Sequence, residues 1–279
     1  MKLIADSGST KTDWCLVAPD GQTSATFRTQ GINPFHQDGD AIAAILRDEL
    51  MPQLAPDSVR HIHFYGSGLR PELKGKMLLL LGSAFPGATD IEAEGDLLGA
   101  ARALCGHQAG IACILGTGSN SCLYDGRQIV GNTPPLGYIL GDEGSGAVLG
   151  RQLLNAVLKG RLPQILRSEL FDSLQMTEAD IISRVYRQPL ANRWLASLAP
   201  FIHDHLTVEG VSQLVTDNFL LFVSRNLTPY EHPELPVSAV GSIAWYFRDQ
   251  LADALQRSGR QLGRVERSPL SLLVRYHAG

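Results

Sequence analysis

The sequence predicts an α/β protein of two similar lobes with mixed sheets and a cleft between them. Two observations carry this prediction. The apolar strand and polar turn of residues 4–10 are echoed by residues 114–120, and each turn leads into a second strand. In addition, the order of strand meander, helix, strand and helix occurs twice, which is typical of sheets covered by helices. Clefts between lobes are common ligand sites.

The composition is that of a globular protein with no general affinity for polyanions. The 279 residues can bury one large core or two smaller ones. Hydrophobic residues make up 44% and charged residues 19%, and the net charge is −4. That charge predicts no nucleic-acid or membrane partner, so any phosphate recognition should be local. We recognise no secretory signal and no membrane span, and the four cysteines form no CxxC pair, so we expect a cytoplasmic protein with reduced thiols.

The first lobe is predicted to comprise residues 1–105 together with 268–279. Strands are expected at 2–6, 12–18, 22–29, 59–65 and 88–93, and helices at 40–50, 71–84 and 96–104. Pro71 suits the first turn of its helix, and Pro52 is expected to end the preceding one. Residues 268–279 are predicted to form a closing helix with Ser268 as its N-cap.

The second lobe is predicted to comprise residues 106–267. Strands are expected at 110–115, 119–124, 127–131 and 237–240. A glycine-rich turn at 141–146 leads into a helix with Leu149 and Leu153 on one face, and residues 162–227 are mostly helical in pattern. Another helix is expected from residue 242 through Leu255.

The two echoed turns are candidate phosphate loops, because such turns point backbone N–H groups and hydroxyls at an anion. In the first turn, Ser9, Thr10 and Lys11 are placed to reach the β- and γ-phosphates of a nucleotide, although Lys11 also fits a solvated turn lysine. Asp6 ends the first strand and is a candidate Mg²⁺ ligand through the ion's water shell, the alternative being an Asx-turn. Thr117, Gly118 and Ser119 form the second turn, for which a plain tight hairpin is the alternative.

Asp96 is the candidate general base for a hydroxyl acceptor, because it lies between a strand and a helix. Aspartate is also a preferred N-cap, and both roles can hold together. Glu92 and Glu94 are nearby carboxylates on the same strand face, and periodicity does not choose among the three.

Two further glycine-containing turns carry candidate ligand contacts. Asp142 and Glu143 lie in the turn before the helix near residue 149, where they fit sugar hydroxyls, magnesium, or a favourable charge at a helix N-terminus. Gly241 and Ser242 follow an apolar strand and suit close approach of the backbone to adenine.

With these pieces in order, the chain resembles the sugar kinase/actin/heat-shock-chaperone ATPase superfamily, and within it the N-acetylglucosamine kinase group of the BadF/BadG/BcrA/BcrD ATPase family. The resemblance rests on Asp6-Ser7-Gly8-Ser9-Thr10-Lys11-Thr12-Asp13, on Leu115-Gly116-Thr117-Gly118-Ser119-Asn120, on Leu140-Gly141-Asp142-Glu143-Gly144-Ser145 and on Gly241-Ser242-Ile243-Ala244. It implies two ribonuclease H-like (actin-like ATPase) lobes and transfer of the ATP γ-phosphate to a sugar 6-hydroxyl, with Mg²⁺.

The resemblance also implies roles for individual residues. Asp96 matches the catalytic aspartate and Asp6 the metal position. The nucleotide positions match Ser9, Thr10, Lys11, Gly116, Thr117, Gly118, Ser119, Gly241 and Ser242. The amino-sugar contacts match Asn33, Ser67, Asn120, Gly137 and Asp142. A homodimer is often implied as well.

Two departures and two alternatives accompany the resemblance. The first loop holds the single Gly8 where the family is richer in glycine, and Leu136 stands where vertebrate amino-sugar kinases have an aromatic residue. The first alternative is an ATPase that activates an acyl-CoA dehydratase or reductase, for which Cys105 and Cys113 would have to hold an iron–sulfur cluster. The second covers two further readings, another sugar kinase and a nucleotide-binding regulator.

Overall fold

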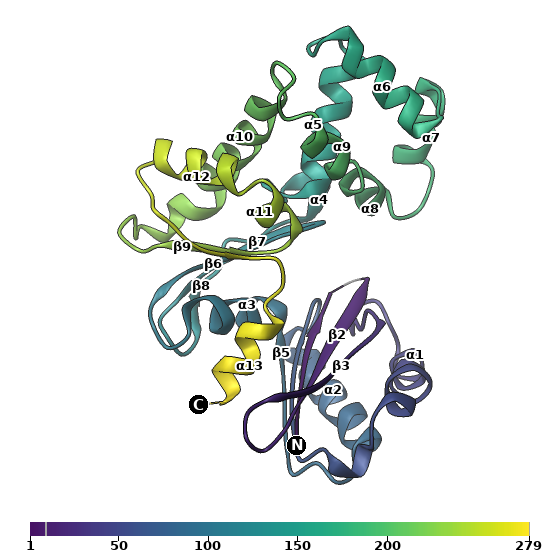
Figure 1. The fold of residues 1–279 in the computed structure, drawn as a ribbon, viewed down its shortest axis with the longest axis vertical. Coiled ribbons are helices and arrows are strands. Elements are labelled where there is room, and N and C mark those ends of the chain that lie inside the picture. The colour runs from purple at the N-terminus through teal and green to yellow at the C-terminus, as the bar shows by residue number, and fades with distance from the viewer. Residues whose placement is uncertain (9, 279) are drawn as a thin grey trace. The chain divides into compact units, whose positions relative to one another are not determined.

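The computed structural model describes residues 1–8 and 10–278, and the chain divides into two compact units. Unit 1 comprises Met1–Gln108, Gly126–Gln128 and Ser268–Gly279, and unit 2 comprises Ala109–Asp125 and Ile129–Arg267. Each unit contains one five-stranded sheet covered by helices (Figure 1).

The sheet of unit 1 is mixed. Its strands are β1 (Lys2–Ser7), β2 (Lys11–Val17), β3 (Thr23–Gln30), β4 (His61–Gly66) and β5 (Asp90–Gly95). They lie in the order β3-β2-β1-β4-β5, with the first three antiparallel as a meander and β1, β4 and β5 parallel to one another. The carboxyl ends of β1, β4 and β5 therefore meet at one edge of the sheet.

Helices cover both faces of this sheet because its strands alternate two sets of apolar side chains. The helices of unit 1 are α1 (Gly39–Ala44), α2 (Pro71–Ala84), α3 (Asp96–Cys105) and α13 (Leu270–Ala278). Leu3 and Ala5 point into the core beneath α1 and α2, whereas Ile4 points into the smaller core beneath α3 and α13 (Figure 1). The sequence prediction of 71–84 as a helix opened by Pro71 is confirmed.

Unit 2 repeats the strand order of unit 1. Its strands are β6 (Gly110–Leu115), β7 (Ser119–Tyr124), β8 (Ile129–Gly131), β9 (Val237–Val240) and β10 (Leu262–Glu266). They lie in the order β8-β7-β6-β9-β10, with a leading antiparallel meander and with β6, β9 and β10 parallel. The predicted pair of similar mixed sheets is therefore confirmed.

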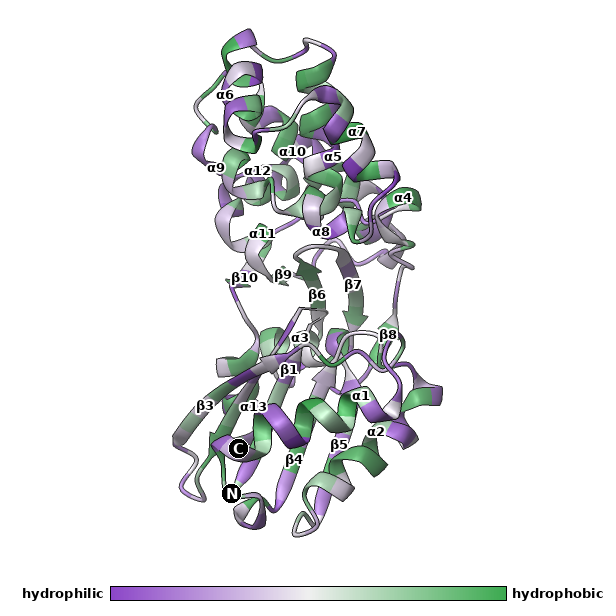
Figure 2. Cartoon of the chain, turned by 90° about the vertical axis from the view of Figure 1, so that its right-hand side faces the viewer, coloured by the Kyte–Doolittle hydropathy of each residue, from purple (hydrophilic) through white to green (hydrophobic). Residues whose placement is uncertain are grey.

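The core of unit 2 lies between its sheet and a layer of helices. These helices are α4 (Gly137–Leu140), α5 (Gly146–Leu158), α6 (Gln164–Leu174), α7 (Glu178–Tyr186), α8 (Ala191–Ala196), α9 (Ala199–Asp204), α10 (Val211–Phe222), α11 (Ser242–Tyr246) and α12 (Arg248–Arg257). Ile111, Cys113 and Leu115 of β6 pack against Leu149 and Phe219 in one continuous cluster. Figure 2 shows β6 as mostly hydrophobic.

Several predicted boundaries are corrected by the structure. The helix expected at 40–50 is α1 followed by a π-helix at Ile45–Leu50, and Pro52 lies inside a 3₁₀ turn at Met51–Gln53. The helix expected through Leu255 breaks at Phe247, which is fully buried and separates α11 from α12. The sequence analysis missed β10, an edge strand with only part-buried and exposed residues, because it lacks a buried apolar face.

Among residues 1–8 and 10–278, none of the helices combines the length and the hydrophobicity that crossing a bilayer requires.

Candidate active site

In unit 1, three predicted site residues lie at the shared carboxyl edge of the parallel strands. The pairing of β1, β4 and β5 places Ser7, Gly66 and Gly95 side by side. Asp6 immediately precedes this row, and Ser67 and Asp96 immediately follow it. Ligands of open α/β sheets bind outside the carboxyl ends of the strands, so this edge is the candidate site of unit 1.

A buried pair of hydroxyls fixes the segment that carries Asn33. Ser7 Oγ lies 2.6 Å from Thr12 Oγ1 and donates to the carbonyl of Ile32 at 2.9 Å. The backbone N–H of Ile32 donates back to Ser7 Oγ at 3.0 Å. These hydrogen bonds hold the segment that follows β3 against the first glycine turn. Asn33, the next residue, therefore lies near the edge of the sheet.

The structure brings Asn33 against the turn that contains Ser67. A Cβ atom on Gly68 would lie 2.2 Å from Asn33 Oδ1, so only glycine allows this contact, and Gly68 also has a φ of +71°. The Ser67 N–H donates to the carbonyl of Ser7 at 2.8 Å. Ser67 Oγ is buried and has no hydrogen-bond partner among the described residues, so its hydroxyl remains available for a further hydrogen bond.

Asp6 and Asp96 form a pair of carboxylates with shifted pKa values. Burial raises the pKa of Asp6 to about 7, and the negative charges of Asp96 and Asp13 add to the shift. Burial also raises the pKa of Asp96 to about 6, although the N–H groups of Leu97 and of Asp96 itself donate to its carboxylate. Two such carboxylates at one sheet edge are a recognised mark of a functional site.

The structure distinguishes Asp96 from the competing carboxylates that periodicity left open. Glu92 accepts from Arg102 Nη1 at 2.7 Å, and Glu94 accepts from Lys74 Nζ at 2.5 Å. Both are therefore engaged in ion pairs, whereas Asp96 has no cationic partner among the described residues. Strand alternation does not extend to Asp96, because β5 ends at Gly95.

The expectation that Asp96 is an N-cap is wrong by one residue. Gly95 is the N-cap of α3, and Asp96 is its first helical residue. Its carboxylate still accepts the first N–H groups of the helix, so the helix N-terminus holds it in place.

Glu92 belongs to a polar network that attaches the C-terminal helix to the sheet. His63 Nδ1 lies 3.1 Å from Glu92 Oε2, and Tyr65 Oη lies 2.8 Å from His277 Nε2. Arg102 Nη1 donates to both Glu92 and Tyr65 at 2.7 Å. The His63 and His277 rings are stacked with centroids 3.7 Å apart, and although His63, Glu92 and His277 bring possible ligand atoms within 4.8 Å of one another, His63 Nδ1 and His277 Nε2 already have Glu92 and Tyr65 as partners. We therefore interpret the network as structural.

This network predicts a loss of stability in acid. Burial lowers the pKa of His277 to about 3, from 6.5 for an ordinary histidine, and nearby His63 acts in the same direction. Between these two values the unfolded chain binds a proton that the folded chain does not, so stability falls as the pH drops below 6.5. We expect His277 to contribute a loss of up to about 2 kcal/mol between pH 7 and pH 5.

The comparison of His277→Gln with the parent protein measures this loss. Asp6 and Asp96 have raised pKa values and act with the opposite sign, so the difference between the two pH profiles isolates the histidine. Urea unfolding should show that the free energy of unfolding falls less between pH 7 and pH 5 in the variant than in the parent protein. The exposed His36→Gln variant serves as control, and equal losses in parent and His277→Gln would contradict the assignment.

Thr10 and Lys11 of the first loop are exposed. Lys11 forms an ion pair with Asp13, whose other oxygen accepts from Arg28 at 2.7 Å. The carbonyl of Thr10 accepts from Gly31 N–H at 3.2 Å, and the residue is exposed to solvent. Ser9 lies outside the described residues.

In unit 2, the second predicted loop (residues 116–119) is hydrogen-bonded to the start of α5. The carbonyls of Gly116 and Thr117 accept from the N–H groups of Gly146 and Ala147 at 2.8 and 3.1 Å. Gly116 N–H donates to the carbonyl of Gly118 at 3.0 Å. Within the described chain, the N–H groups of Thr117 and Gly118 have no backbone acceptor, so they are available to an anion.

Asp142 lies directly against this loop. A Cβ atom on Gly118 would lie 3.1 Å from Asp142 Oδ2, and the carboxylate accepts from the N–H groups of Ser119 and Gly137. Burial raises the pKa of Asp142 to about 6, and the charge of Glu143 adds to the shift. The backbone of Asp142 is left-handed, with φ of +54°, a strain typical of functional positions.

Two residues beside Asp142 have structural tasks. Buried Glu143 accepts from Arg225 Nη1 at 2.6 Å; although burial opposes ionisation, this bond and one from Asn226 hold its pKa below the usual range. Asn218 is fully buried on α10, where it accepts from Gly144 N–H at 3.1 Å and donates to the carbonyl of Ser145 at 3.3 Å. The sequence analysis missed Asn218, because nothing in a helical pattern marks a distant partner.

The structure also brings the Gly241-Ser242 pair to the second loop. Gly241 has a φ of +120°, and a Cβ atom there would lie 2.2 Å from the carbonyl oxygen of Leu115 and 3.3 Å from the N atom of Gly116. Ser242 begins α11 and is exposed. The amide oxygen of Asn120 is instead occupied by N–H groups of Ser121 and Asn132 at 2.9 and 3.0 Å.

The two cysteines of the iron–sulfur alternative lie in different units, and one of them lies inside a strand. Cys113 is fully buried inside β6 and belongs to unit 2, whereas Cys105 ends α3 in unit 1, and the four thiols are free of disulfides. No observation therefore favours the iron–sulfur alternative.

The comparisons with known proteins agree with this architecture. No protein-family model and no curated protein matches the chain. A crystal structure from Porphyromonas gingivalis that bears the name putative N-acetylglucosamine kinase matches with a TM-score of 0.97 and 48% identity, covering 100% of this chain and 99% of that one.

Two more distant structures share the fold. A Chromobacterium violaceum protein of the same name matches with a TM-score of 0.73 and 22% identity over 99% of this chain and 98% of that one. A ROK family glucokinase from Streptomyces griseus, solved with glucose and AMPPNP, has a TM-score of 0.59 and 13% identity over 99% and 97% of the two chains. The identity and full coverage of the Porphyromonas match, together with the two repeated sheets, show that this chain belongs to the family of N-acetylglucosamine kinase-like proteins with the actin-like ATPase fold.

Proposed function

We propose that the protein is an ATP-dependent kinase that phosphorylates the 6-hydroxyl of N-acetylglucosamine. The observation that carries the proposal is the Asp6–Asp96 pair at the carboxyl edge of β1, β4 and β5, in a chain 48% identical to a protein that bears the name putative N-acetylglucosamine kinase. Phosphoryl transfer needs positioning, charge neutralisation and a base for the acceptor hydroxyl, and the two units offer a candidate for each.

Asp96 is the proposed general base. Its carboxylate has no cationic partner among the described residues, and the α3 N-terminus fixes its orientation. With a pKa raised to about 6, it is mostly ionised at neutral pH and matched to accept a hydroxyl proton as the phosphoryl group transfers.

Each unit offers its own proposed sugar contacts. In unit 1, Ser67 offers an unpaired hydroxyl, and Asn33 lies against the same turn. In unit 2, Asp142 is a hydrogen-bond acceptor held by the N–H groups of Ser119 and Gly137. Asn120 is proposed from the family resemblance.

The nucleotide is proposed to bind the glycine loops. Thr117 and Gly118 present free N–H groups for phosphate oxygens, and Thr10, Lys11 and Ser9 are the matching residues of the first loop. Gly241 has no side chain beside Leu115, so a flat base could approach the backbone closely there. The next residue, Ser242, is also a proposed nucleotide contact. The Streptomyces glucokinase of the same fold binds AMPPNP.

Asp6 fits a magnesium ion. A hard carboxylate oxygen is a preferred Mg²⁺ ligand, and the negative charge of Asp96 acts on Asp6, so a cation at this position would be attracted by both carboxylates. When bound, Mg²⁺ would neutralise charge on the transferring phosphates.

A panel of sugars tests the proposed function. With ATP and Mg²⁺, N-acetylglucosamine should give a higher kcat/KM than glucose, glucosamine or N-acetylmannosamine in a coupled ADP assay. Phosphorus and carbon NMR should place the phosphate on O6, and 6-deoxy-N-acetylglucosamine should not be phosphorylated. Absence of sugar-dependent ADP release across the panel would overturn the proposal.

Ser67→Ala separates binding from stability. Removing an unpaired buried hydroxyl should leave the free energy of unfolding unchanged or slightly higher, because no hydrogen bond within the protein is lost. If Ser67 Oγ bonds the sugar, the KM for the sugar should rise about tenfold, which corresponds to the loss of one hydrogen bond of roughly 1.4 kcal/mol. An unchanged KM would remove Ser67 from the site.

A further inference from the structure

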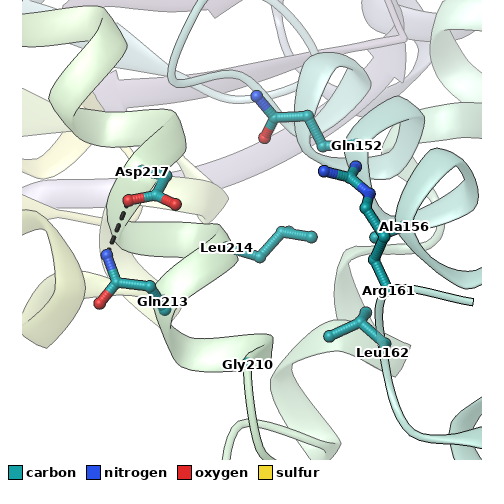
Figure 3. A pocket seen from close by; sticks show the side chains of 8 residues that line it. All are labelled: Gln152, Ala156, Arg161, Leu162, Gly210, Gln213, Leu214 and Asp217. Carbon is teal, nitrogen blue, oxygen red and sulfur yellow. Dashed lines mark hydrogen bonds between the residues drawn. The ribbon is translucent and has the colours of Figure 1, made fainter.

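A cavity lies in unit 2 between α5 and α10, and none of its lining residues belongs to the two glycine loops (Figure 3). It has a volume of about 330 Å³, which is at the small end of ligand pockets. Leu162 and Leu214 give it an apolar floor. Gln152 and Arg161 form one wall, and Asp217 stands on the other.

The two walls carry opposite charges that do not neutralise each other. Within the described chain, neither Arg161 nor Asp217 forms an ion pair. Arg161 donates one N–H to Asn155 Oδ1 at 2.7 Å and keeps its other guanidinium donors. Asp217 accepts from Gln213 Nε2 at 2.7 Å through Oδ1, which leaves Oδ2 without a partner (Figure 3).

A third polar group at this cavity is unsatisfied. Gln152 Oε1 is buried and has no hydrogen-bond partner among the described residues. Figure 3 shows its amide beside Arg161, with the oxygen turned toward the space that Leu214 and Asp217 border. A buried acceptor without a donor is costly, and a ligand N–H group would relieve that cost.

We propose that this cavity binds a small zwitterion whose ammonium and anionic groups lie at opposite ends. The ammonium group bonds Asp217 and Gln152 Oε1, the anionic group bonds the Arg161 guanidinium, and the carbon skeleton covers Leu214. Hexosamine phosphates and ω-amino acids both have this chemistry, the first with a phosphate and the second with a carboxylate.

Both walls lead directly to the loops of the candidate active site. On α10, Asp217 precedes Asn218, which hydrogen-bonds the backbone of Gly144 and Ser145. At the start of α5, the first N–H groups of the helix donate to the carbonyls of Gly116 and Thr117. A ligand that bridges α5 and α10 should therefore change the apparent KM for ATP. This consequence rests on the proposed function, whereas the binding itself does not.

Isothermal titration calorimetry of the whole protein tests the binding. D-Glucosamine 6-phosphate and 6-aminohexanoate serve as probes for the two sources, and D-glucose 6-phosphate and hexanoate serve as controls because they lack the ammonium group. We expect at least one probe to bind in the micromolar to millimolar range, and its control to bind at least tenfold more weakly. Which probe binds identifies the anionic group.

Two variants test whether the heat of probe binding comes from this cavity. Arg161→Gln and Asp217→Asn change exposed side chains, so both should fold, and each should weaken binding at least tenfold. The exposed Arg187→Gln in the same unit should leave binding within threefold of the parent. No heat from either probe, equal binding of the controls, or binding unaffected by both cavity variants would overturn the proposal. An unchanged KM for ATP with a bound probe would overturn the coupling alone.

Discussion

Asp96→Asn is expected to lower kcat for sugar phosphorylation by about 10²–10⁴-fold while nucleotide affinity stays nearly unchanged, as removal of a general base does. The amide keeps the size of the carboxylate but does not accept a proton at neutral pH. The α3 N-terminus would still hold the side chain, since an amide oxygen also accepts the N–H groups of Leu97 and of residue 96 itself. The loss should therefore appear in kcat and not in stability.

Glu94→Gln is the matched control for this substitution. It removes the same charge from the same strand–helix junction, but Glu94 is already engaged by Lys74. We expect its kcat to stay within a few-fold of the parent value. Stopped-flow turnover with saturating sugar, together with calorimetric titration of AMPPNP, measures both variants. Full sugar-dependent turnover in Asp96→Asn would reject Asp96 as the base.

Gly241→Ala is expected to lower the free energy of unfolding of unit 2 by about 2–4 kcal/mol and to weaken ATP binding at least tenfold. At φ of +120° an L-residue is strained whatever space it has. The new methyl carbon would also lie 2.2 Å from the Leu115 carbonyl oxygen, which is backbone and does not rotate away. The second loop must then shift, together with the free N–H groups of Thr117 and Gly118.

Gly116→Ala separates the steric effect from a general sensitivity of the loop. Its Cβ would meet no atom within 4 Å, and its φ is not in the left-handed region. Urea unfolding should therefore show a loss well under that of Gly241→Ala. Equal losses in the two variants would show that the contact with Leu115 is not the cause.

Local patterns predicted most elements of the fold correctly. The apolar runs that predicted strands at 2–6 and 110–115, and the Pro71 start of the helix at 71–84, depend on residues only a few positions apart, and the structure confirms these elements as β1, β6 and α2. The prediction failed where an element depends on distant contacts. β10 exists because β9 offers it a parallel edge, and the break at Phe247 exists because that ring is buried in the unit 2 core.

The candidate site divides in the same way. Glycine turns and carboxylates are visible in the sequence because turn chemistry is local, so Asp6, Asp96 and Asp142 were found as candidates. Their environments were not visible. The ion pairs of Glu92 with Arg102 and of Glu94 with Lys74 join residues on different elements, and they are what leaves Asp96 as the unpaired carboxylate.

The sequence by itself determined that the chain has two similar α/β halves, each opened by a strand and a polar glycine turn, since periodicity and turn composition act over short distances. Only the tertiary structure decided which polar atoms remain unsatisfied, such as Ser67 Oγ and Gln152 Oε1, and which carboxylates have raised pKa values. The physical reason is that burial and hydrogen-bond pairing depend on every element packed around a group, and those elements come from distant parts of the chain.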